Sequence, residues 1–375
     1  MRSDELLTGR RIPVYTLTGF LGSGKTSFLT RLLEHPRMAR TAVIVNEFGD
    51  VGLDQLTIRQ VDEQVRLLAH GCLCCLARDD LLETLRTLYA DQLKEGIEVC
   101  DRVIIETSGM ADPIPVVHTM LADPLLQERF IYRGTLVTVD LLQPADGLLA
   151  RVEGARQVAA ADLFVLTKAD LAPASAAGGM RPTLQRLNPI ADVLGNEPAA
   201  LDEIALRIAE EQVDCSSDRL GATDWLLAAL GRAGRADKKN GNQPFRRNRI
   251  AHERSPVESY VLRLEEAVRW PEFTAWLQRL LSHNQERLLR LKGVVEVDRE
   301  PEPIVVQAVR QLFHPCYPLP RRPGDERGSR LVLIVDNQER STRRDLGVAT
   351  LGAEIFCASD RAEPTTMEAL ERALL

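Results

Sequence analysis

The sequence lacks the features that mark a secreted or membrane protein. Residues Met1 to Arg11 contain no apolar segment of the kind found in secretory signal peptides. No apolar run approaches the roughly 20 residues that a membrane-spanning helix needs. We therefore expect a cytoplasmic protein with no membrane partner.

The sequence also lacks an excess of positive charge and a set of paired cysteines. The formal net charge is −7, which argues against nucleic acid as a partner. Three of the seven cysteines cluster at Cys72, Cys74 and Cys75 and the others are scattered, which is not the spacing of a disulfide framework. A thiol cluster in a cytosolic chain more often indicates metal or redox chemistry.

The sequence does contain a regular alternation of strand-like and helix-like segments. The chain has 375 residues, 45% of them hydrophobic, which predicts two soluble globular domains. In residues 1–215, short β-branched runs each end in a polar motif and are followed by a helical pattern. One of these helical patterns spans Pro182 to Leu187. This order predicts an α/β fold with a doubly wound, mostly parallel sheet. Ligands bind at the carboxyl ends of such strands, so we expect the motifs to build one site.

The later part of the chain has a different pattern. Residues 216–250 include a stretch rich in Gly, Arg and Lys, which indicates a flexible linker. In residues 251–375 strands outnumber helices, which predicts a second, smaller α+β domain. Its expected helices span Pro271 to Leu281, with Phe273, Trp276, Leu277 and Leu280 on one face, and Thr365 to Leu375.

The first motif is a phosphate-binding loop. Residues Gly19 to Thr26 read G-x-x-x-x-G-K-T, after an apolar strand and before a helical pattern, as a P-loop NTPase requires. Its backbone N–H groups and the helix N-terminus can hold phosphates. Lys25 can reach the β- and γ-phosphates, and the Thr26 hydroxyl can bind Mg²⁺. The predicted nucleotide contacts here are Gly22, Ser23, Gly24, Lys25, Thr26 and Ser27.

Two further acidic positions fit the same chemistry. Glu106 ends an apolar strand and begins E-x-x-G, which places Gly109 where a γ-phosphate could be sensed. Mg²⁺ prefers oxygen ligands, and Glu106 could supply one. Asp50, in the loop after the second strand, could lie near the metal or the attacking water. The predicted catalytic residues are therefore Lys25, Thr26, Glu106 and Asp50.

A third motif indicates which base is bound. Thr167-Lys168-Ala169-Asp170 matches the guanine-reading pattern [N/T]-K-x-D, with Thr167 where asparagine is usual. The Asp170 carboxylate can accept hydrogen bonds from guanine N1–H and N2–H₂, whereas adenine N1 is an acceptor and would repel it. The lysine stem can lie over the base plane. The alternative is an ordinary strand-to-helix turn that Asp170 caps.

The thiol cluster is the least common of the motifs. Cys72, Cys74 and Cys75 supply three thiolates within four residues, and thiolates suit Zn²⁺. A fourth ligand could come from elsewhere or the position could be open, and an incomplete shell suits a metal that is handed on. A redox site would need a clean C-x-x-C spacing, and buried structural cysteines rarely cluster in this way.

Together these motifs resemble those of one family, the CobW-type GTP-binding proteins, which are relatives of the urease and hydrogenase maturation GTPases. The resemblance rests on the P-loop, Asn46-Glu47-Phe48-Gly49, Gly71-Cys72-Leu73-Cys74-Cys75, Glu106-Thr107-Ser108-Gly109 and Thr167-Lys168-Ala169-Asp170, in that order. It implies that residues 251–375 form a CobW C-terminal-like domain.

The resemblance also implies a function. It implies GTP and Mg²⁺ as cofactors, GTP hydrolysis, and Zn²⁺ or Co²⁺ bound at Cys72, Cys74 and Cys75 for delivery to a client metalloprotein. Two other hypotheses stay open: a nucleotide-gated activator that only senses the metal, and an ATP-using kinase with an incidental zinc. A homo-oligomer also stays open.

Overall fold

The chain divides into two compact units, which we consider separately. The first is Met1–Gln185 with Ala191–Ala222, and the second is Arg186–Ile190 with Thr223–Leu375. The predicted linker at 216–250 lies outside the described residues, so its boundaries stay a prediction. The computed structural model describes residues 11–46, 67–69, 77–92, 100–210, 257–264, 266–284, 287–314, 316–321 and 328–336.

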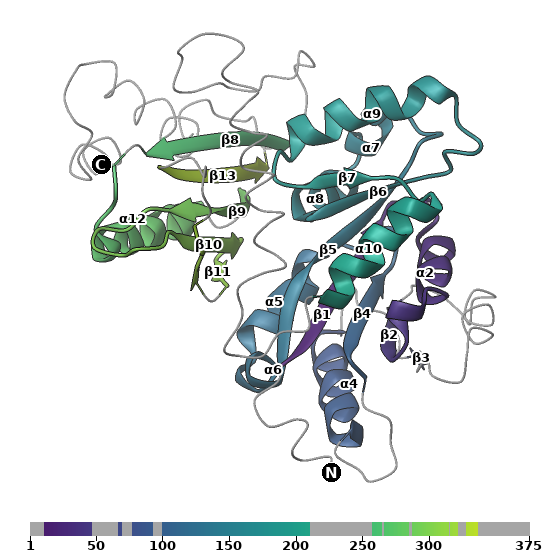
Figure 1. Ribbon diagram of the computed structural model, residues 1–375, viewed down its shortest axis with the longest axis horizontal. Coiled ribbons are helices and arrows are strands. Elements are labelled where there is room, and N and C mark those ends of the chain that lie inside the picture. Colours follow the sequence, from purple (N-terminus) through teal and green to yellow (C-terminus); the bar gives the residue numbers. More distant parts are fainter. Residues whose placement is uncertain are drawn as a thin grey trace. The chain divides into compact units, whose positions relative to one another are not determined.

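The first unit is built on a parallel sheet of seven strands in the order β3-β2-β4-β1-β5-β6-β7. Each neighbouring pair is parallel, which confirms the predicted α/β sheet. All the carboxyl ends therefore meet at one edge of the sheet (Figure 1). The strands are β1 Ile12–Gly19, β2 Thr41–Asn46, β3 Leu67–Ala69, β4 Arg102–Thr107, β5 Phe130–Asp140, β6 Leu163–Thr167 and β7 Asp192–Leu194.

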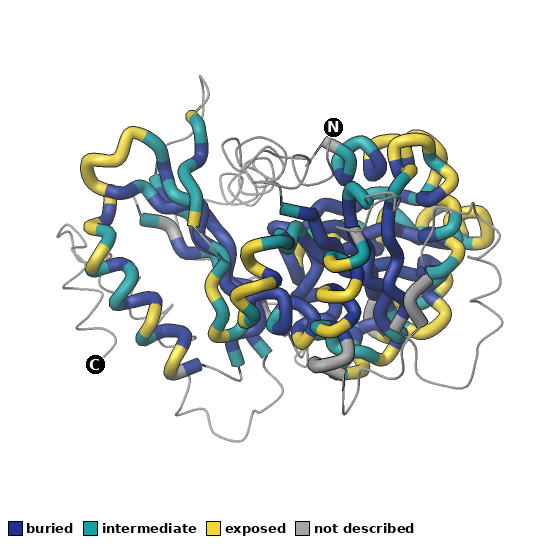
Figure 2. Tube along the Cα trace, turned by 90° about the horizontal axis from the view of Figure 1, so that it is seen from below, coloured by how far each residue is buried: buried dark blue, intermediate teal, exposed yellow. Residues whose placement is uncertain are grey.

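Helices cover both faces of this sheet. Apolar residues of α2 and α10 pack on one face, and those of α4, α5 and α6 pack on the other. The strands are accordingly buried, and the exposed residues lie on the surrounding helices and loops (Figure 2). The helices are α2 Lys25–Leu33, the 3₁₀ helix η1 Pro36–Met38, α4 Ala77–Gln92, α5 Ile114–Ala122, α6 Pro124–Arg129, α7 Ala145–Leu149, α8 Val152–Ala160, α9 Ala174–Leu187 and α10 Pro198–Glu210.

Helix α9 is longer than the sequence predicts. The helical pattern was expected only from Pro182 to Leu187, because proline usually ends or begins a helix. The helix instead begins at Ala174 and contains Pro182 in its interior. Met180, Leu184 and Leu187 are all buried, and this tertiary packing outweighs the local preference of proline.

The second unit is an antiparallel sheet in the order β11-β10-β9-β13-β8, with β12 paired to β10. Phe273, Trp276, Leu277 and Leu280 of α12 pack in its core, as the sequence predicts. The predicted helix at 365–375 lies outside the described residues. The elements are β8 Val257–Leu264, α12 Trp270–His283, β9 Leu288–Val295, β10 Ile304–Val309, β11 Leu312–Phe313, β12 Tyr317–Pro318 and β13 Ser329–Asp336. Within the described residues, no helix is both long and apolar enough to cross a membrane.

Candidate functional site

The phosphate-binding loop joins β1 to α2 at the carboxyl edge of the sheet. Gly22 and Gly24 have φ angles of 74° and 82°, in the left-handed region that glycine adopts without strain. Gly24 directly precedes α2, and no side chain caps this end of the helix. The first amides of a helix have no carbonyl partner within it and carry the positive end of its dipole. The loop and the first turn of the helix, from Lys25 to Ser27, therefore have the geometry and the charge of an anion-binding site.

Three of the predicted catalytic residues lie together at this loop. The Lys25 Nζ atom donates to the Gly19 carbonyl at 3.0 Å, and the lysine is buried. Thr26 Oγ1 donates to Glu106 Oε1 at 2.9 Å. Glu106 lies near the end of β4 and is only 1% exposed. A hydroxyl and a carboxylate oxygen thus lie side by side, and both are ligands that Mg²⁺ prefers.

Gly109 lies directly against the phosphate-binding loop. A Cβ atom at this position would be 2.7 Å from both Cα and N of Leu21, so only glycine fits without a shift of the backbone. The Nε2 atom of Gln157, on α8, donates to the carbonyls of Gly109 and Ala111, at 3.2 Å each. Gln157 is fully buried. No local pattern in the sequence singles out this glutamine, because its partners are more than 40 residues away in the chain.

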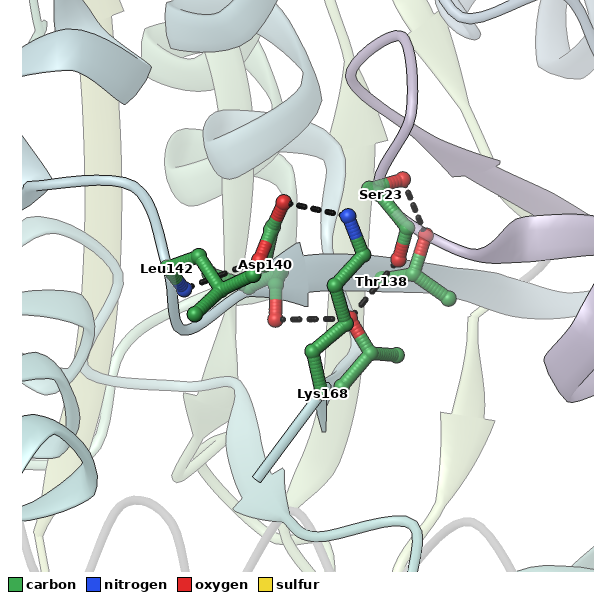
Figure 3. A network of polar contacts seen from close by, with 7 residues as sticks. Ser23, Thr138, Asp140, Leu142 and Lys168 are labelled. Carbon is green, nitrogen blue, oxygen red and sulfur yellow. Dashed lines mark hydrogen bonds and ion pairs between the residues drawn. The ribbon is translucent and has the colours of Figure 1, made fainter. Parts of the chain in front are cut away.

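The base-reading motif is tied to the phosphate-binding loop through Thr167. Its hydroxyl donates to the Ser23 carbonyl at 2.7 Å and lies 3.1 Å from the Val139 carbonyl. A hydroxyl has one proton, so the shorter contact is the main hydrogen bond. The Ser23 side chain in turn bonds to Thr138, with 2.7 Å between the two hydroxyl oxygens (Figure 3). Threonine therefore supplies a donor at the position where the motif usually has asparagine.

Lys168 is held by an aspartate of the neighbouring strand. Its Nζ atom lies 2.7 Å from Asp140 Oδ2. The other carboxylate oxygen, Oδ1, accepts from the backbone N–H of Leu142 at 2.8 Å. Figure 3 shows the lysine side chain extending toward Asp140 at the end of β5. The sequence places Asp140 at a strand end, a position that could have marked it as a site residue.

Asp170 lies in the turn that follows β6. Its side chain is exposed. The alternative hypothesis was that Asp170 caps the next helix. However, α9 begins at Ala174, so the residue in the cap position is Pro173. The exposed carboxylate is therefore available to a ligand, and guanine reading stays a prediction.

Four predicted site residues lie outside the described part of the chain: Asp50, Cys72, Cys74 and Cys75. Among the described residues, no group of three or more His, Cys, Asp or Glu side chains could hold a metal ion. The strands that lead into these segments are described. Val45 of β2 is in register with Glu106 on one side and with Ala69 of β3 on the other.

The parallel sheet and its phosphate-binding loop define a P-loop nucleotide-binding protein. Residues 13–195 match the CobW/HypB/UreG nucleotide-binding domain. Residues 257–347 match the cobalamin synthesis protein cobW C-terminal domain. The chain belongs to the CobW/HypB/UreG family, which confirms the resemblance drawn from the motifs.

Relatives with known names match over most of the chain. The zinc chaperone YjiA of Escherichia coli is 30% identical over 332 residues, which are 87% of this chain and 94% of that protein. The structure of Zn(II)-bound YjiA GTPase from E. coli has a TM-score of 0.56 at 25% identity, covering 88% of this chain and 96% of that one. The zinc-regulated GTPase metalloprotein activator 1 of Schizosaccharomyces pombe is 31% identical over 202 residues, 52% of this chain and 48% of that protein.

Proposed function

We propose that this protein is a GTPase that binds zinc at Cys72, Cys74 and Cys75 and couples its nucleotide cycle to delivery of the metal to a client metalloprotein. The observation that carries the proposal is the joint placement of the phosphate-binding loop, Glu106 and the base-reading turn at one sheet edge. The names of the relatives, a zinc chaperone and a zinc-regulated GTPase, support it at the level of the family.

The nucleotide would lie along this edge, with its phosphates at the start of α2. In this proposal Lys25 and the first amides of α2 bind the phosphates, while Lys168 and Asp170 bind guanine. The hydrogen bond from Thr167 to Ser23 would hold the base-reading turn against the phosphate-binding loop. Nucleotide binding and base selection would therefore depend on each other.

The residues present fit a magnesium ion. Thr26 and Glu106 bring two oxygen ligands within 2.9 Å of each other in a partly buried setting. When bound, Mg²⁺ would neutralise charge that develops on the phosphates during hydrolysis. Glu106 would hold the Thr26 hydroxyl in place, and the Gly109 amide would sense the γ-phosphate next to Leu21. Asp50 is proposed to orient the attacking water.

In the sequence, the metal motif comes shortly after a strand that ends at the same edge of the sheet. Only two residues along the chain separate Ala69, at the end of β3, from Cys72. Through Val45, the end of β3 is two strands from Glu106, or about 10 Å at the usual strand spacing. A change at the γ-phosphate could thus alter the segment that carries the thiolates. By linkage, the factor by which GTP in place of GDP changes the metal affinity equals the factor by which bound metal changes the preference for GTP over GDP.

A metal titration tests this proposal. Zn²⁺ affinity is measured by competition with a chromogenic chelator, with Mg²⁺ and either GDP or a non-hydrolysable GTP analogue. We expect the two nucleotides to change the zinc affinity by about tenfold, a typical coupling between two sites. Cys74→Ser should weaken zinc binding in both states. Equal zinc affinity with GDP and with the GTP analogue would contradict the coupling.

Cys316→Ser is the matched control for this experiment. Cys316 lies outside the motif, and its thiol is not in a disulfide. Cys316 is exposed, and a single thiol supplies one ligand where a zinc site needs three or four. Its replacement should leave the zinc affinity unchanged. Cobalt is tested in the same titration.

A second candidate function is activation of a client without metal transfer. The name of the S. pombe relative, a metalloprotein activator, favours it. The two functions differ in what happens to bound metal. Transfer predicts that ⁶⁵Zn loaded on this protein reaches the apo-client when GTP is hydrolysed. Activation predicts that Cys74→Ser still activates a client that has been supplied with free zinc. A preference for ATP over GTP in a binding titration would instead favour the kinase hypothesis.

A further inference from the structure

The carboxylate of Asp140 lies at the candidate site, but the proposed function assigns it no role. It lies at the end of β5 and is 7% exposed. One oxygen accepts the Lys168 ammonium at 2.7 Å, and the other accepts the Leu142 amide at 2.8 Å. The second contact fixes the carboxylate on its own strand end. Asp140 is therefore a rigid anchor for a long and otherwise flexible lysine side chain.

The backbone of Lys168 supports the same geometry. Lys168 has a φ angle of 59°, a left-handed conformation that is uncommon for a lysine. The carbonyl of Lys168 accepts from the amides of Leu171 and Ala172, at 3.1 and 3.0 Å, which closes the turn around it. The preceding residue, Thr167, is tied to Ser23. Both ends of the lysine are thus held: the backbone by the turn, and the ammonium by Asp140.

We propose that Asp140 is a positioning residue for nucleotide recognition, which holds the Lys168 stem extended so that a guanine base can stack on it. This inference rests on the proposed guanine site. The stem of a lysine is apolar and can cover a ring, while its ammonium stays with a charged partner. Because the lysine is already ordered, binding of the base does not have to restrict its rotamers. Asp140 contributes affinity without touching the nucleotide.

The opposite role for the ion pair makes an opposite prediction. If the contact were a latch that nucleotide must break, its loss would free Lys168 and tighten nucleotide binding. If the contact is a clamp, its loss weakens binding. The sign of the change in Kd therefore separates the two roles.

The test uses the full-length chain and a fluorescent GDP, with unlabelled GDP and inorganic pyrophosphate as competitors. Asp140→Asn removes the charge but keeps an oxygen that can accept the Leu142 amide. We expect the Kd for GDP to rise about fivefold to tenfold, the usual effect of disordering one long side chain. The Ki of pyrophosphate should not change, because pyrophosphate reaches only the phosphate-binding loop.

Two further variants complete the test. In a Lys168→Ala background, Asp140→Asn should have no additional effect, since the two residues act as a unit. Asp123→Asn is the matched control. Asp123 makes the same two kinds of contact, with the Leu126 amide and the Arg86 guanidinium, each at 3.0 Å. It directly precedes α6, before the amino end of β5, so the Kd for GDP should stay unchanged.

The outcomes distinguish failure of this inference from failure of the proposed function. An unchanged or lower Kd for GDP in Asp140→Asn overturns the clamp. Equal weakening of GDP and pyrophosphate also overturns it, because the aspartate would then support the whole edge rather than the base. If the wild type shows no preference for GDP over ADP, the guanine site fails and the inference fails with it.

Discussion

The contact between Thr167 and Ser23 offers a sharp test of how the site is held together. Thr167→Val keeps the shape of the side chain and removes its hydroxyl, which donates to the Ser23 carbonyl at 2.7 Å. Thr167 is 2% exposed, so water is not at hand to replace the lost donor. Loss of a buried hydrogen bond of this kind costs about 1–2 kcal/mol. For a unit of this size, the midpoint of thermal unfolding should fall by about 2–8 °C.

Thr16→Val is the matched control for this substitution. Thr16 lies on β1 of the same sheet and is fully buried. Its hydroxyl oxygen has no hydrogen-bond partner among the described residues. Removal of a buried hydroxyl that lacks a partner relieves a desolvation penalty. The same substitution should therefore leave the unfolding midpoint unchanged or raise it slightly.

The assay for both variants is differential scanning calorimetry. Intrinsic fluorescence is less suitable, because the three tryptophans, Trp225, Trp270 and Trp276, all belong to the second unit. The Kd for GTP is measured in parallel, and for Thr167→Val it should rise by up to about tenfold, the limit set by the strength of one hydrogen bond. If Thr167→Val and Thr16→Val unfold at the same temperature and bind GTP equally, the contact does not hold the site together.

Three other predictions follow from the same site. Gly109→Ala should reduce GTP affinity by about fivefold to 150-fold in a nucleotide titration, because its Cβ would lie 2.7 Å from backbone atoms of Leu21, and overpacking costs about 1–3 kcal/mol. Unchanged affinity would contradict the close contact. Gln157→Leu should lower the calorimetric midpoint, because a buried contact to Gly109 and a partly buried contact to Ala111 lose their donor. Loss of the unpartnered Oε1 of Gln157 offsets part of this, so the net cost is about 1–3 kcal/mol. A variant as stable as the wild type would mean that these bonds contribute little. Glu106→Gln should slow single-turnover GTP hydrolysis by about a hundredfold or more while still accepting a hydrogen bond from Thr26, because the metal ligand loses its charge. Full activity would remove Glu106 from the magnesium site.

The parts of the fold that follow local rules were predictable from sequence. Strand, glycine-rich loop and helix are adjacent in the chain, so the phosphate-binding loop can be recognised from Gly19 to Thr26 alone. The buried strands could be predicted because short runs of β-branched apolar residues, bounded by turn residues, are typical of buried strands. Helix α9 was missed over its first half because Pro182 argues locally against a helix, whereas the burial of Leu184 is a tertiary effect.

The contacts that join the motifs could not be predicted in this way. Lys168 and Asp140 are 28 residues apart, and Gln157 and Gly109 are 48 apart. No periodicity or spacing relates such pairs, because their approach depends on which strands become neighbours in the sheet. The order β4-β1-β5-β6 decides this. The sequence indicates that each motif ends a strand, but not which motif faces which.

The sequence by itself determined the class of this protein. Its P-loop, E-x-x-G, T-K-x-D and cysteine motifs each depend on residues that are close together in the chain, so each can be recognised from the sequence alone. Only the tertiary structure decided how these motifs act on one another. Thr167 reaches Ser23 across 144 residues of chain, and Asp140 reaches Lys168 from a neighbouring strand. The physical reason is that hydrogen bonds and ion pairs act over a few ångströms in space, whatever the separation along the chain.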